Sequence, residues 1–278
     1  MRKSKYLVLT PIFVKFNETL TEIKYISFYF DARGLTPLNI LDISRFNKLY
    51  IIKTAQIQTS PFINFVFLPN SIKILGIISF LQCQIKYINL SNCWKLKDLE
   101  KQAFRQNIMH SLDLSKCNYL NYIGCEAFTE NKIKRIELPI NVKYILFGAF
   151  SHNEIEYLDL SKYKNLREIS NGTFGRNEIK HIKFPPNIEL IRLNSFIFNQ
   201  IEILDLTECK LLKEIEIDAF SNNPIREVKI LDNVIYSDIE KVQDSNDNFD
   251  KFMIYYYKNN KKSGDYIYIN GEWQWYPL

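Results

Sequence analysis

Histidine and cysteine are the residues of this chain best suited to bind a metal or to act as nucleophiles. The 278 residues include three histidines and five cysteines. His110, His152 and His181 each occupy a different place in the repeating pattern described below, so they cannot align into a metal site. No G-x-S-x-G, phosphate-binding loop or H-E-x-x-H motif is present. The sequence therefore predicts a protein that is not an enzyme and has no metal and no cofactor.

Three of the cysteines share one place in the repeat. Cys93, Cys117 and Cys209 each follow a Ser or Thr by two residues. Cys93 and Cys117 belong to adjacent repeats, so a strand spacing of about 4.8 Å would bring them within reach of a disulfide. The alternative, which we favour, is that these cysteines are small, buried apolar side chains.

The composition allows a large apolar core and argues against two classes of function. Apolar residues make up 46% of the chain. The 36 Lys and Arg residues are interspersed with 31 Asp and Glu residues, whereas a nucleic-acid-binding face needs clustered basic residues. No run of about 18 apolar residues occurs, so we expect no membrane span. The N-terminal MRKSKYLVLTPIFVKF starts like an export signal, but Pro11 and Lys15 interrupt its apolar run.

An internal repeat runs through most of the chain. Each unit opens with an apolar residue, followed three residues later by a second and then, at strand period, by a third, as in Ile155, Leu158 and Leu160. One such unit cannot bury its own apolar edge, but stacked units share a continuous core, so the repeat predicts a solenoid. The units, 22 to 25 residues apart, begin at Leu38, Ile63, Ile85, Met109, Ile133, Ile155, Ile179, Ile201 and, for a partial unit, Ile225.

Two columns of residues are predicted to hold the stack together. The first is a Phe in each unit, and its rings are expected to form a spine. The second is an Asn three residues later, which can donate and accept hydrogen bonds and so bridge one coil to the next. The alternative is that Asn simply favours turns here. The Phe column is Phe80, Phe104, Phe128, Phe150, Phe174, Phe196 and Phe220. The Asn column is Asn107, Asn131, Asn153, Asn177, Asn199 and Asn223, with Cys83 in the same place one unit earlier.

Short and long units differ between the strand and the next apolar pair. In short units Pro69, Pro139 and Pro185 pre-set a tight corner. Long units begin a wider corner at Ser or Thr, such as Ser115 or Thr207, and take two more residues. Because the apolar skeleton stays in phase on both sides, the extra residues must project outward.

These units resemble the BspA-like leucine-rich repeats, also called the Treponema pallidum type. The family's unit is similar to L-x-x-L-x-L-P-x-x-L-x-x-I-x-x-x-A-F-x-x-C/N, and the likeness covers about residues 38–231. It is greatest in IKRIELPINVKYILFGAFSHNE, although Ile often replaces Leu and Asn stands where many members carry Cys. The resemblance implies a repeat solenoid, mostly β with turns, of about nine units of 22–25 residues, with a parallel sheet on its concave face.

The resemblance also implies binding or adhesion, often at the surface of bacteria or protists, and it brings no catalytic residue. We therefore predict a protein-binding or adhesion module whose concave face recognises another protein or surface macromolecule, and no nucleic acid. The alternatives are a structural or self-associating scaffold, acting through its ends or convex side, and a scaffold inside a larger cytoplasmic complex. The family suggests a cell-surface or secreted protein, whereas the interrupted signal leaves a cytoplasmic location as the alternative.

The ends of the repeat are predicted to be capped, because an end coil would expose its core. Residues 1–37 form the predicted N-terminal cap with a degenerate half-repeat, residues 38–231 form the repeats, and residues 232–278 form the C-terminal cap. In the last region, apolar residues from Phe249 to Tyr257 fall at helical spacing, with Asp247 or a neighbour as the helix cap. The stretch NNKKSG is expected to end this helix with Gly264.

A β-hairpin is expected to follow the C-terminal helix. Alternating residues flank Asn270 and Gly271, a pair typical of a two-residue hairpin turn. Trp273 and Trp275 have the same parity and so lie on one side of the hairpin. We expect them to pack against the last coil, with an exposed aromatic binding patch as the alternative.

Candidate binding residues flank the inward apolar residue of each predicted strand. Near the N-terminal end, Tyr25, Ile40, Phe65, Phe67 and Tyr87 would form an apolar patch that either binds a partner or packs on itself and under the cap. The complete set of candidates is Phe65, Phe67, Tyr87, Asp113, Arg135, Glu137, Tyr157, Asp159, His181 and Lys183.

Within this set, three acids follow one another in neighbouring units. Asp113, Glu137 and Asp159 would repel, because like charges directly opposite each other destabilise a sheet. One interpretation is a solvated acidic surface that Arg135 and Lys183 partly neutralise. The other is a docking site for a basic partner segment or, as a weaker alternative, for Ca²⁺.

Overall fold

The computed structural model describes residues 7–8, 22–23, 26–27, 40–53, 57 and 63–278. Most of the predicted N-terminal cap, including Tyr25, lies outside these residues. Three short strands are described within it: β1 (Leu7–Val8), β2 (Glu22–Ile23) and β3 (Ile26–Ser27). The chain forms two compact units, residues 1–140 and 141–278, which are treated separately below.

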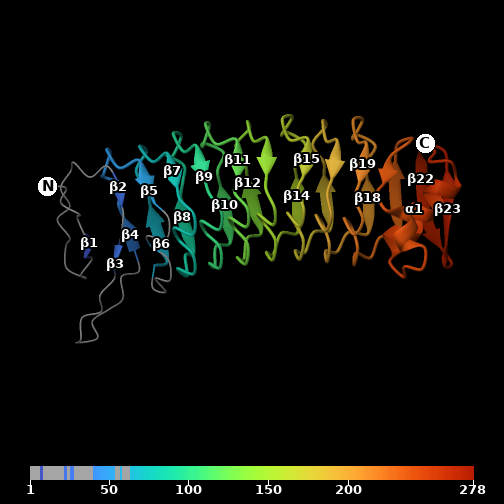
Figure 1. Ribbon diagram of the computed structural model, residues 1–278, viewed down its shortest axis with the longest axis horizontal. Coiled ribbons are helices and arrows are strands. Elements are labelled where there is room, and N and C mark those ends of the chain that lie inside the picture. Colours follow the sequence, from blue (N-terminus) through green and yellow to red (C-terminus); the bar gives the residue numbers. More distant parts are fainter. Residues whose placement is uncertain (1–6, 9–21, 24–25, 28–39, 54–56, 58–62) are drawn as a thin grey trace. The chain divides into compact units, whose positions relative to one another are not determined.

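Each coil of the first unit contributes a three-residue strand and, after a corner, a two-residue strand (Figure 1). In the three-residue strands the middle side chain points inward and its two neighbours point outward, as strand period requires. Like strands pair in parallel, in the orders β4-β6-β8, β10-β12 and β2-β5-β7-β9. The three-residue strands are β4 (Ile40–Asp42), β6 (Phe65–Phe67), β8 (Tyr87–Asn89), β10 (Ser111–Asp113) and β12 (Arg135–Glu137). The two-residue strands are β5 (Ile51–Ile52), β7 (Ile74–Leu75), β9 (Asp98–Leu99) and β11 (Tyr122–Ile123).

The second unit repeats this plan. Its parallel ladders are β14-β16, β18-β20 and β15-β17-β19-β21. The outward-facing strands are β14 (Tyr157–Asp159), β16 (His181–Lys183), β18 (Ile203–Asp205) and β20 (Glu227–Ile230). The two-residue strands are β13 (Tyr144–Ile145), β15 (Glu168–Ile169), β17 (Leu190–Ile191), β19 (Glu214–Ile215) and β21 (Ile235–Tyr236). Each unit is thus a solenoid of parallel strands, which confirms the fold predicted from the repeat.

A column of phenylalanine rings runs through the core of each unit. In the first unit Phe104 stacks on Phe80 and Phe128, with ring centroids 5.0 and 5.5 Å apart and planes within 8° of parallel. In the second unit the successive centroid distances are 5.7, 5.6 and 5.2 Å, and the stacked rings are those of Phe150, Phe174, Phe196 and Phe220. Full burial of each ring contributes about 1.5–3 kcal/mol, and the offset stacking adds roughly 0.5–1.5 kcal/mol.

The turn around each Phe has a fixed backbone geometry. The residues two before and two after the Phe adopt left-handed conformations, such as Gln102 and Gln106 with φ of 55° and 56°. This geometry directs the N–H groups of Gln102, Phe104 and Gln106 to carbonyls of the next coil, at 2.8 to 2.9 Å. The second unit does the same from Gly148 and Phe150. Successive coils are therefore joined by backbone hydrogen bonds at the turn as well as in the ladders.

The Asn column makes the same connection with side chains. The Asn107 amide donates to the carbonyl oxygens of Phe80 and Phe104, both at 2.9 Å, and its Oδ1 accepts from the N–H of Ile85 at 2.9 Å. In the second unit the Asn177 amide donates to two Phe carbonyls in the same way, at 3.0 and 3.1 Å. Each Asn thus satisfies backbone groups of two coils that would otherwise be buried without partners.

The second unit ends in a helix and a hairpin, as predicted. A short 3-10 helix, η1 (Ile239–Val242), precedes α1 (Asn248–Lys258), and Asp247 caps α1 by accepting from the N–H groups of Phe249 and Asp250. Strands β22 (Gly264–Ile269) and β23 (Glu272–Tyr276) extend the sheet in the order β18-β20-β22-β23. Asn270 and Gly271, with φ of 51° and 92°, form the turn between them.

Two details of the C-terminal prediction are wrong. Gly264 does not end the helix, because α1 stops at Lys258 and the left-handed residues that follow are Asn260 and Lys261. Gly264 starts β22, where an added Cβ would lie 2.1 Å from the indole nitrogen of Trp275. The close approach of this ring therefore explains the glycine.

The tryptophans also differ from expectation. Trp273 is buried against Phe252 of α1, with ring centroids 5.3 Å apart, and also contacts Tyr268. The Trp275 indole donates to the Ser263 carbonyl at 3.1 Å. The ring of Trp273 therefore packs on the helix, where the sequence predicted the last coil.

The three cysteines that share one place in the repeat are buried thiols. Cys93, Cys117 and Cys209 form no disulfide, and burial raises the pKa of each to about 12. They fill space as small apolar side chains.

Candidate functional site

The outward residues of the three-residue strands form one face of each unit, here called the sheet face. In the first unit the register aligns Ile40, Phe65 and Tyr87 across β4, β6 and β8. These side chains are 51%, 39% and 44% exposed, which is high for such large apolar groups. Phe67 lies beside them, with its ring centroid 6.2 Å from that of Tyr87.

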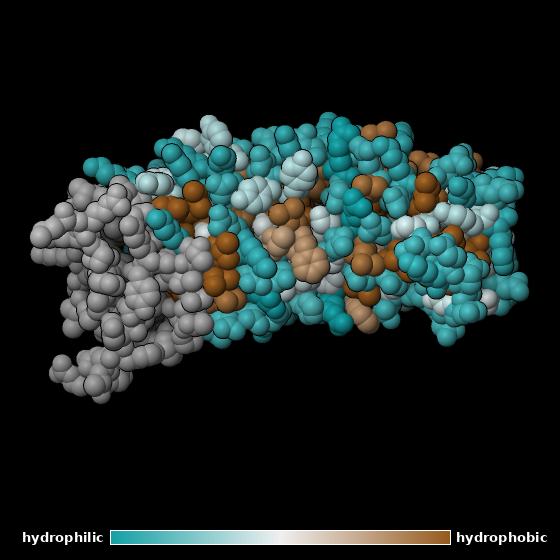
Figure 2. Space-filling model, in the orientation of Figure 1, coloured by the Kyte–Doolittle hydropathy of each residue, from teal (hydrophilic) through white to brown (hydrophobic). Residues whose placement is uncertain are grey.

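We call these four residues the apolar sheet patch. On the face of the molecule shown in Figure 2, clusters of apolar side chains interrupt a mostly hydrophilic surface. Exposed apolar clusters of this kind often mark interfaces. The patch brings together three of the sequence candidates, Phe65, Phe67 and Tyr87.

The next two strands of the first unit carry polar candidates. Asp113 of β10 and Glu137 of β12 are register partners, so these two acids are neighbours as expected. Arg135 occupies the adjacent outward position of β12. Asp159 belongs to the second unit, where its neighbours are different.

In the second unit the sheet face is held by polar contacts. The Tyr157 hydroxyl donates to Asp159 at 3.2 Å, and the Lys183 ammonium lies 3.7 Å from the same carboxylate. Partial burial by itself would raise the pKa of Asp159, but hydrogen bonds from Ser161 and Tyr157 and the charge of Lys183 outweigh it and lower that pKa. His181 is the register partner of Tyr157. Tyr157, Asp159, His181 and Lys183 therefore form one polar group.

The acids of this column also have a structural role that the sequence interpretation missed. Asp113 accepts from the N–H of Ser115 at 2.8 Å, and Asp159 accepts from the N–H of Ser161 at 3.0 Å. The other long corners are closed in the same way, by the pairs Asp42–Ser44, Asn89–Ser91 and Asp205–Thr207. Short corners place Pro at this position, which has no N–H to satisfy. The available signal was an Asp or Asn two residues before the Ser or Thr of every long unit.

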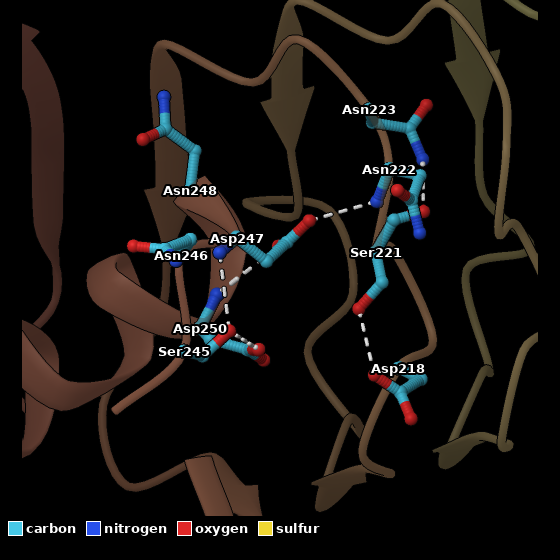
Figure 3. Close-up of a pocket in the computed structure, with 9 residues that line it drawn as sticks. All are labelled: Asp218, Ser221, Asn222, Asn223, Ser245, Asn246, Asp247, Asn248 and Asp250. Atoms are coloured by element: carbon cyan, nitrogen blue, oxygen red, sulfur yellow. Dashed lines mark hydrogen bonds between the residues drawn. The ribbon is translucent and has the colours of Figure 1, made fainter. Parts of the chain in front are cut away.

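A polar pocket of about 550 Å³ lies in the second unit, between the coil of Phe220 and the start of α1 (Figure 3). Asp247 accepts from the N–H of Asn222 at 2.7 Å, in addition to its helix-capping bonds. Burial raises the pKa of Asp247, although its three N–H donors oppose that shift. The lining residues are Asp218, Ser221, Asn222, Asn223, Ser245, Asn246, Asp247, Asn248 and Asp250.

The carboxylates of this pocket join the cap to the stack. The buried Asp250 accepts from Ser245 at 2.6 Å and from the Tyr236 hydroxyl at 2.5 Å. That hydroxyl in turn accepts from the N–H of Asp218 at 3.3 Å. Burial, together with the bond to Asp250, raises the pKa of Tyr236, so it remains a neutral donor. At this pocket, side chains of the C-terminal cap make the contacts to the last coil that a further coil would otherwise make.

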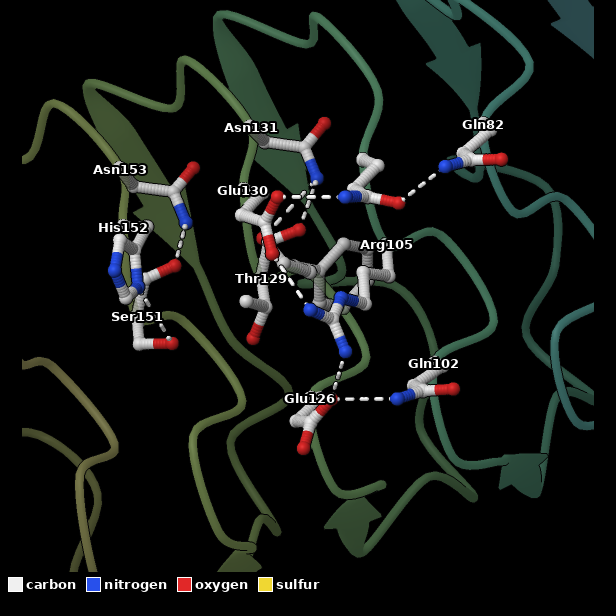
Figure 4. Close-up of polar contacts among 12 residues, drawn as sticks. Gln82, Gln102, Arg105, Glu126, Thr129, Glu130, Asn131, Ser151, His152 and Asn153 are labelled. Atoms are coloured by element: carbon white, nitrogen blue, oxygen red, sulfur yellow. Dashed lines mark hydrogen bonds and ion pairs between the residues drawn. The ribbon is translucent and has the colours of Figure 1, made fainter.

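A second polar network covers the Phe turns of the first unit (Figure 4). Arg105 forms ion pairs with Glu126 at 2.5 Å and with Glu130 at 2.6 Å. The amides of Gln102 and Gln106 donate to the same two carboxylates. The network links two coils, and its members other than Arg105 are left-handed residues.

Two kinds of feature are absent from the described part of the chain. No group of three His, Cys, Asp or Glu side chains there is arranged to hold a metal ion. The described helices also include none that is long and apolar enough to cross a membrane.

Comparison with protein families gives one clear match. The BspA-type leucine-rich repeat region matches residues 12–111, 50–163 and 121–241, in six copies. Among curated proteins, none is similar enough to count as a match.

Several solved structures are similar to parts of this chain at low sequence identity. The pneumococcal vaccine antigen PcpA is 17% identical, with a TM-score of 0.42, over 84% of this chain and 67% of that one. A leucine-rich repeat protein from Bacteroides ovatus is 17% identical, with a TM-score of 0.40, over 68% of this chain and 66% of its own. A leucine-rich cell surface protein from Faecalibacterium prausnitzii is 15% identical, with a TM-score of 0.37, over 66% of this chain and 45% of its own. This chain thus spans less than two thirds of the last two proteins.

Proposed function

Because the chain belongs to the BspA-type leucine-rich repeat family, we propose that it is a non-catalytic module that binds another protein through its sheet face. The observation that carries this proposal is the apolar sheet patch. Ile40, Phe65 and Tyr87 are about half exposed on three paired strands, whereas the next residue of each strand is buried. Aromatic side chains that are already held rigid lose little entropy on binding and often supply most of the affinity.

The polar half of the sheet face would then set specificity. Asp113, Glu137 and Arg135 lie on the strands next to the patch and remain in the first unit. Charged residues around an apolar centre favour complementary partners and raise the association rate. A partner with an apolar centre and a basic flank fits this arrangement best.

The test is partner capture by a double variant, Phe65→Ser with Tyr87→Ser. We expect the variant to bind a partner identified with the wild-type protein at least about tenfold more weakly, the scale of losing two interface aromatics. Leu211→Ser, which removes a side chain 44% exposed outside the sheet face, is the matched control. If the double variant unfolds like wild type and binds equally well, the sheet face is not the binding surface.

Self-association is the second candidate function. Strand β23 ends the order β18-β20-β22-β23, so one of its edges has no strand partner among the described residues. Such edges can pair with another chain. Sedimentation over a range of concentrations tests this: a concentration-dependent dimer supports it, and a monomer throughout rejects it.

We place the proposed binding role at the cell surface, with the cytoplasm as the alternative. Protease treatment of intact cells distinguishes them, because only a surface protein is digested while the cells stay sealed.

A further inference from the structure

The corners of the first unit carry a strip of uncompensated positive charge. The corner segments are residues 44–50, 69–73, 91–97 and 115–121, and they contain no Asp or Glu. Their apolar residues are buried in the core, and most of their polar and charged side chains are exposed between the two strands of each coil. We call their six cations the basic corner strip: Arg45, Lys48, Lys73, Lys95, Lys97 and Lys116.

None of these six cations forms an ion pair with a described residue. Lys73 and Lys97 are also direct neighbours, since the N–H of Lys97 donates to the carbonyl of Lys73 at 2.9 Å. In the second unit the same column reads Lys143, Arg167, Glu189 and Lys213 from β13 to β19, and Glu189 pairs with Arg167 and Lys213. This column therefore includes one acid in the second unit and none in the first, where Lys73 and Lys97 are adjacent although like charges in adjacent strands reduce stability.

The acids next to these corners in the sequence form no ion pair with the strip among the described residues. Asp42 and Asp113 end the preceding strands, and each is used to close its corner through the N–H of Ser44 or Ser115. Asp98 follows the third corner and accepts from the Tyr122 hydroxyl at 3.4 Å. Acidic and basic residues are interspersed along the sequence as a whole. Only the stacking of the coils shows that these six cations gather in one place.

Exposed aromatic rings accompany these cations. Tyr50, Trp94 and Tyr119 are 41%, 43% and 62% exposed. Trp94 and Tyr119 come from adjacent coils, with centroids 6.2 Å apart and planes inclined by 43°. The Lys95 ammonium lies 4.7 Å from the centre of the Trp94 ring, and that of Lys73 lies 6.0 Å from the Tyr50 ring.

Every one of these corners also offers an amide. The exposed side chains of Asn47, Asn70, Asn92 and Asn118 have no hydrogen-bond partner among the described residues. The strip therefore combines ammonium groups, rings and free amides at a coil spacing of about 4.8 Å.

We propose that the basic corner strip binds an acidic polysaccharide, one whose sugar rings carry carboxylate or sulfate groups. The ammonium groups would pair with the anionic substituents, the amides would hydrogen-bond the hydroxyls, and Trp94 and Tyr119 would contact the apolar faces of the sugars. This surface is separate from the apolar sheet patch, and the proposal does not depend on the proposed protein-binding function.

Other polyanions fit the strip less well. Five of the six cations are lysines, whereas bidentate recognition of phosphate and stacking on bases favour arginine. A membrane surface would have to cover the exposed amides with lipid, which is costly without hydrogen-bond partners. Neither objection applies to a hydroxyl-rich polymer.

Calorimetric titration of the full chain with a polyuronate tests the proposal. Separate titrations with neutral dextran, single-stranded oligothymidylate and anionic phospholipid vesicles serve for comparison. We expect binding to the polyuronate that weakens as salt increases, and little binding to the others. Lys73→Gln with Lys97→Gln should weaken it roughly tenfold. Lys164→Gln with Lys210→Gln, the same charge change at exposed corners of the second unit, should leave it unchanged.

Two further variants complete the test. Trp94→Ala with Tyr119→Ala should also weaken binding, because a purely electrostatic contact would not need the rings. Phe65→Ser with Tyr87→Ser should bind the polyuronate like wild type. Equal binding by the Lys73/Lys97 variant, equal binding by the Trp94/Tyr119 variant, or tighter binding of the oligonucleotide or the vesicles would each overturn the proposal.

Discussion

At the scale of single residues, the stack of coils depends on buried Asn side chains whose hydrogen bonds water cannot make in their place. Asn177 is buried, and it donates to the carbonyls of Phe150 and Phe174 while accepting from the N–H of Ile155. The six Asn residues in register could be recognised from the sequence as a column. Their hydrogen-bond partners could not, because those depend on the left-handed turn around each Phe.

Replacement of Asn177 by Asp should destabilise the protein by at least about 2–3 kcal/mol. The shape is nearly the same, but the change removes the amide donors and places a carboxylate against two carbonyl oxygens. Urea unfolding measures the loss. Asn165→Asp, at an exposed corner of the same unit, should change stability by less than about 0.5 kcal/mol. Equal effects of the two substitutions would contradict the bridging role.

A second prediction concerns the pH dependence of Asp159. Its pKa is lowered in the folded protein, so its contribution to stability is present above the unfolded value, near 3.9, and is lost as pH falls toward the folded pKa. Asn89 closes the same corner in another coil, so Asp159→Asn should keep the corner. The variant should therefore lose less stability than wild type between about pH 5 and pH 3. If a change from pH 5 to pH 3 destabilises the wild type and the Asp159→Asn variant by the same amount, Asp159 does not have this role.

At the scale of elements, the predictions were confirmed where residues close together in the sequence determine the local structure by themselves. The Asn270–Gly271 turn and the helix from Asn248 follow from local residues alone, and both are present. Gly264 was assigned to the wrong element because glycine favours helix ends in general. Its actual cause is a contact with Trp275, and contacts between distant residues are not visible in a local pattern.

The two glycines of the hairpin should therefore respond differently to substitution. Gly264→Ala would place a methyl group against the Trp275 ring and should displace it, at a cost of about 1–3 kcal/mol. At Gly271 an added Cβ meets nothing within 4 Å, so Gly271→Ala should cost only the left-handed backbone preference, about 1 kcal/mol. Thermal unfolding compares the stabilities, and a change in indole fluorescence should accompany only Gly264→Ala.

At the scale of the whole molecule, the chain is two compact units of one repeat, and only the second is described with its cap. The sequence predicted this solenoid because each coil repeats the same few apolar positions. It did not reveal the basic corner strip, because residues from four separate segments become neighbours only when the coils stack. It also missed the pocket at the C-terminal seam, whose residues come from segments about 25 positions apart.

Removal of residues 244–278 should expose the end of the second unit. Phe249 packs against Phe220, with centroids 5.0 Å apart, and Asp247 satisfies the N–H of Asn222. A chain that ends at residue 243 should therefore aggregate, because its last coil would present an open core and unpaired backbone donors. Light scattering checks this. A monodisperse product with cooperative unfolding would show that the helix and hairpin are dispensable.

The N–H groups of the Phe turns all point toward the next coil along the chain, and this shared direction has an electrostatic consequence. Peptide dipoles that share one direction add, as they do in an α-helix, so each stack of turns should carry a macrodipole with its positive pole at the C-terminal end. In the second unit that pole meets the positive pole of α1, because the N–H of Asn222 and the first N–H groups of the helix all converge on Asp247. One carboxylate thus serves as the counter-charge for two dipoles that would otherwise repel. Any segment that ends such a stack must supply an acceptor for these N–H groups, whatever its fold.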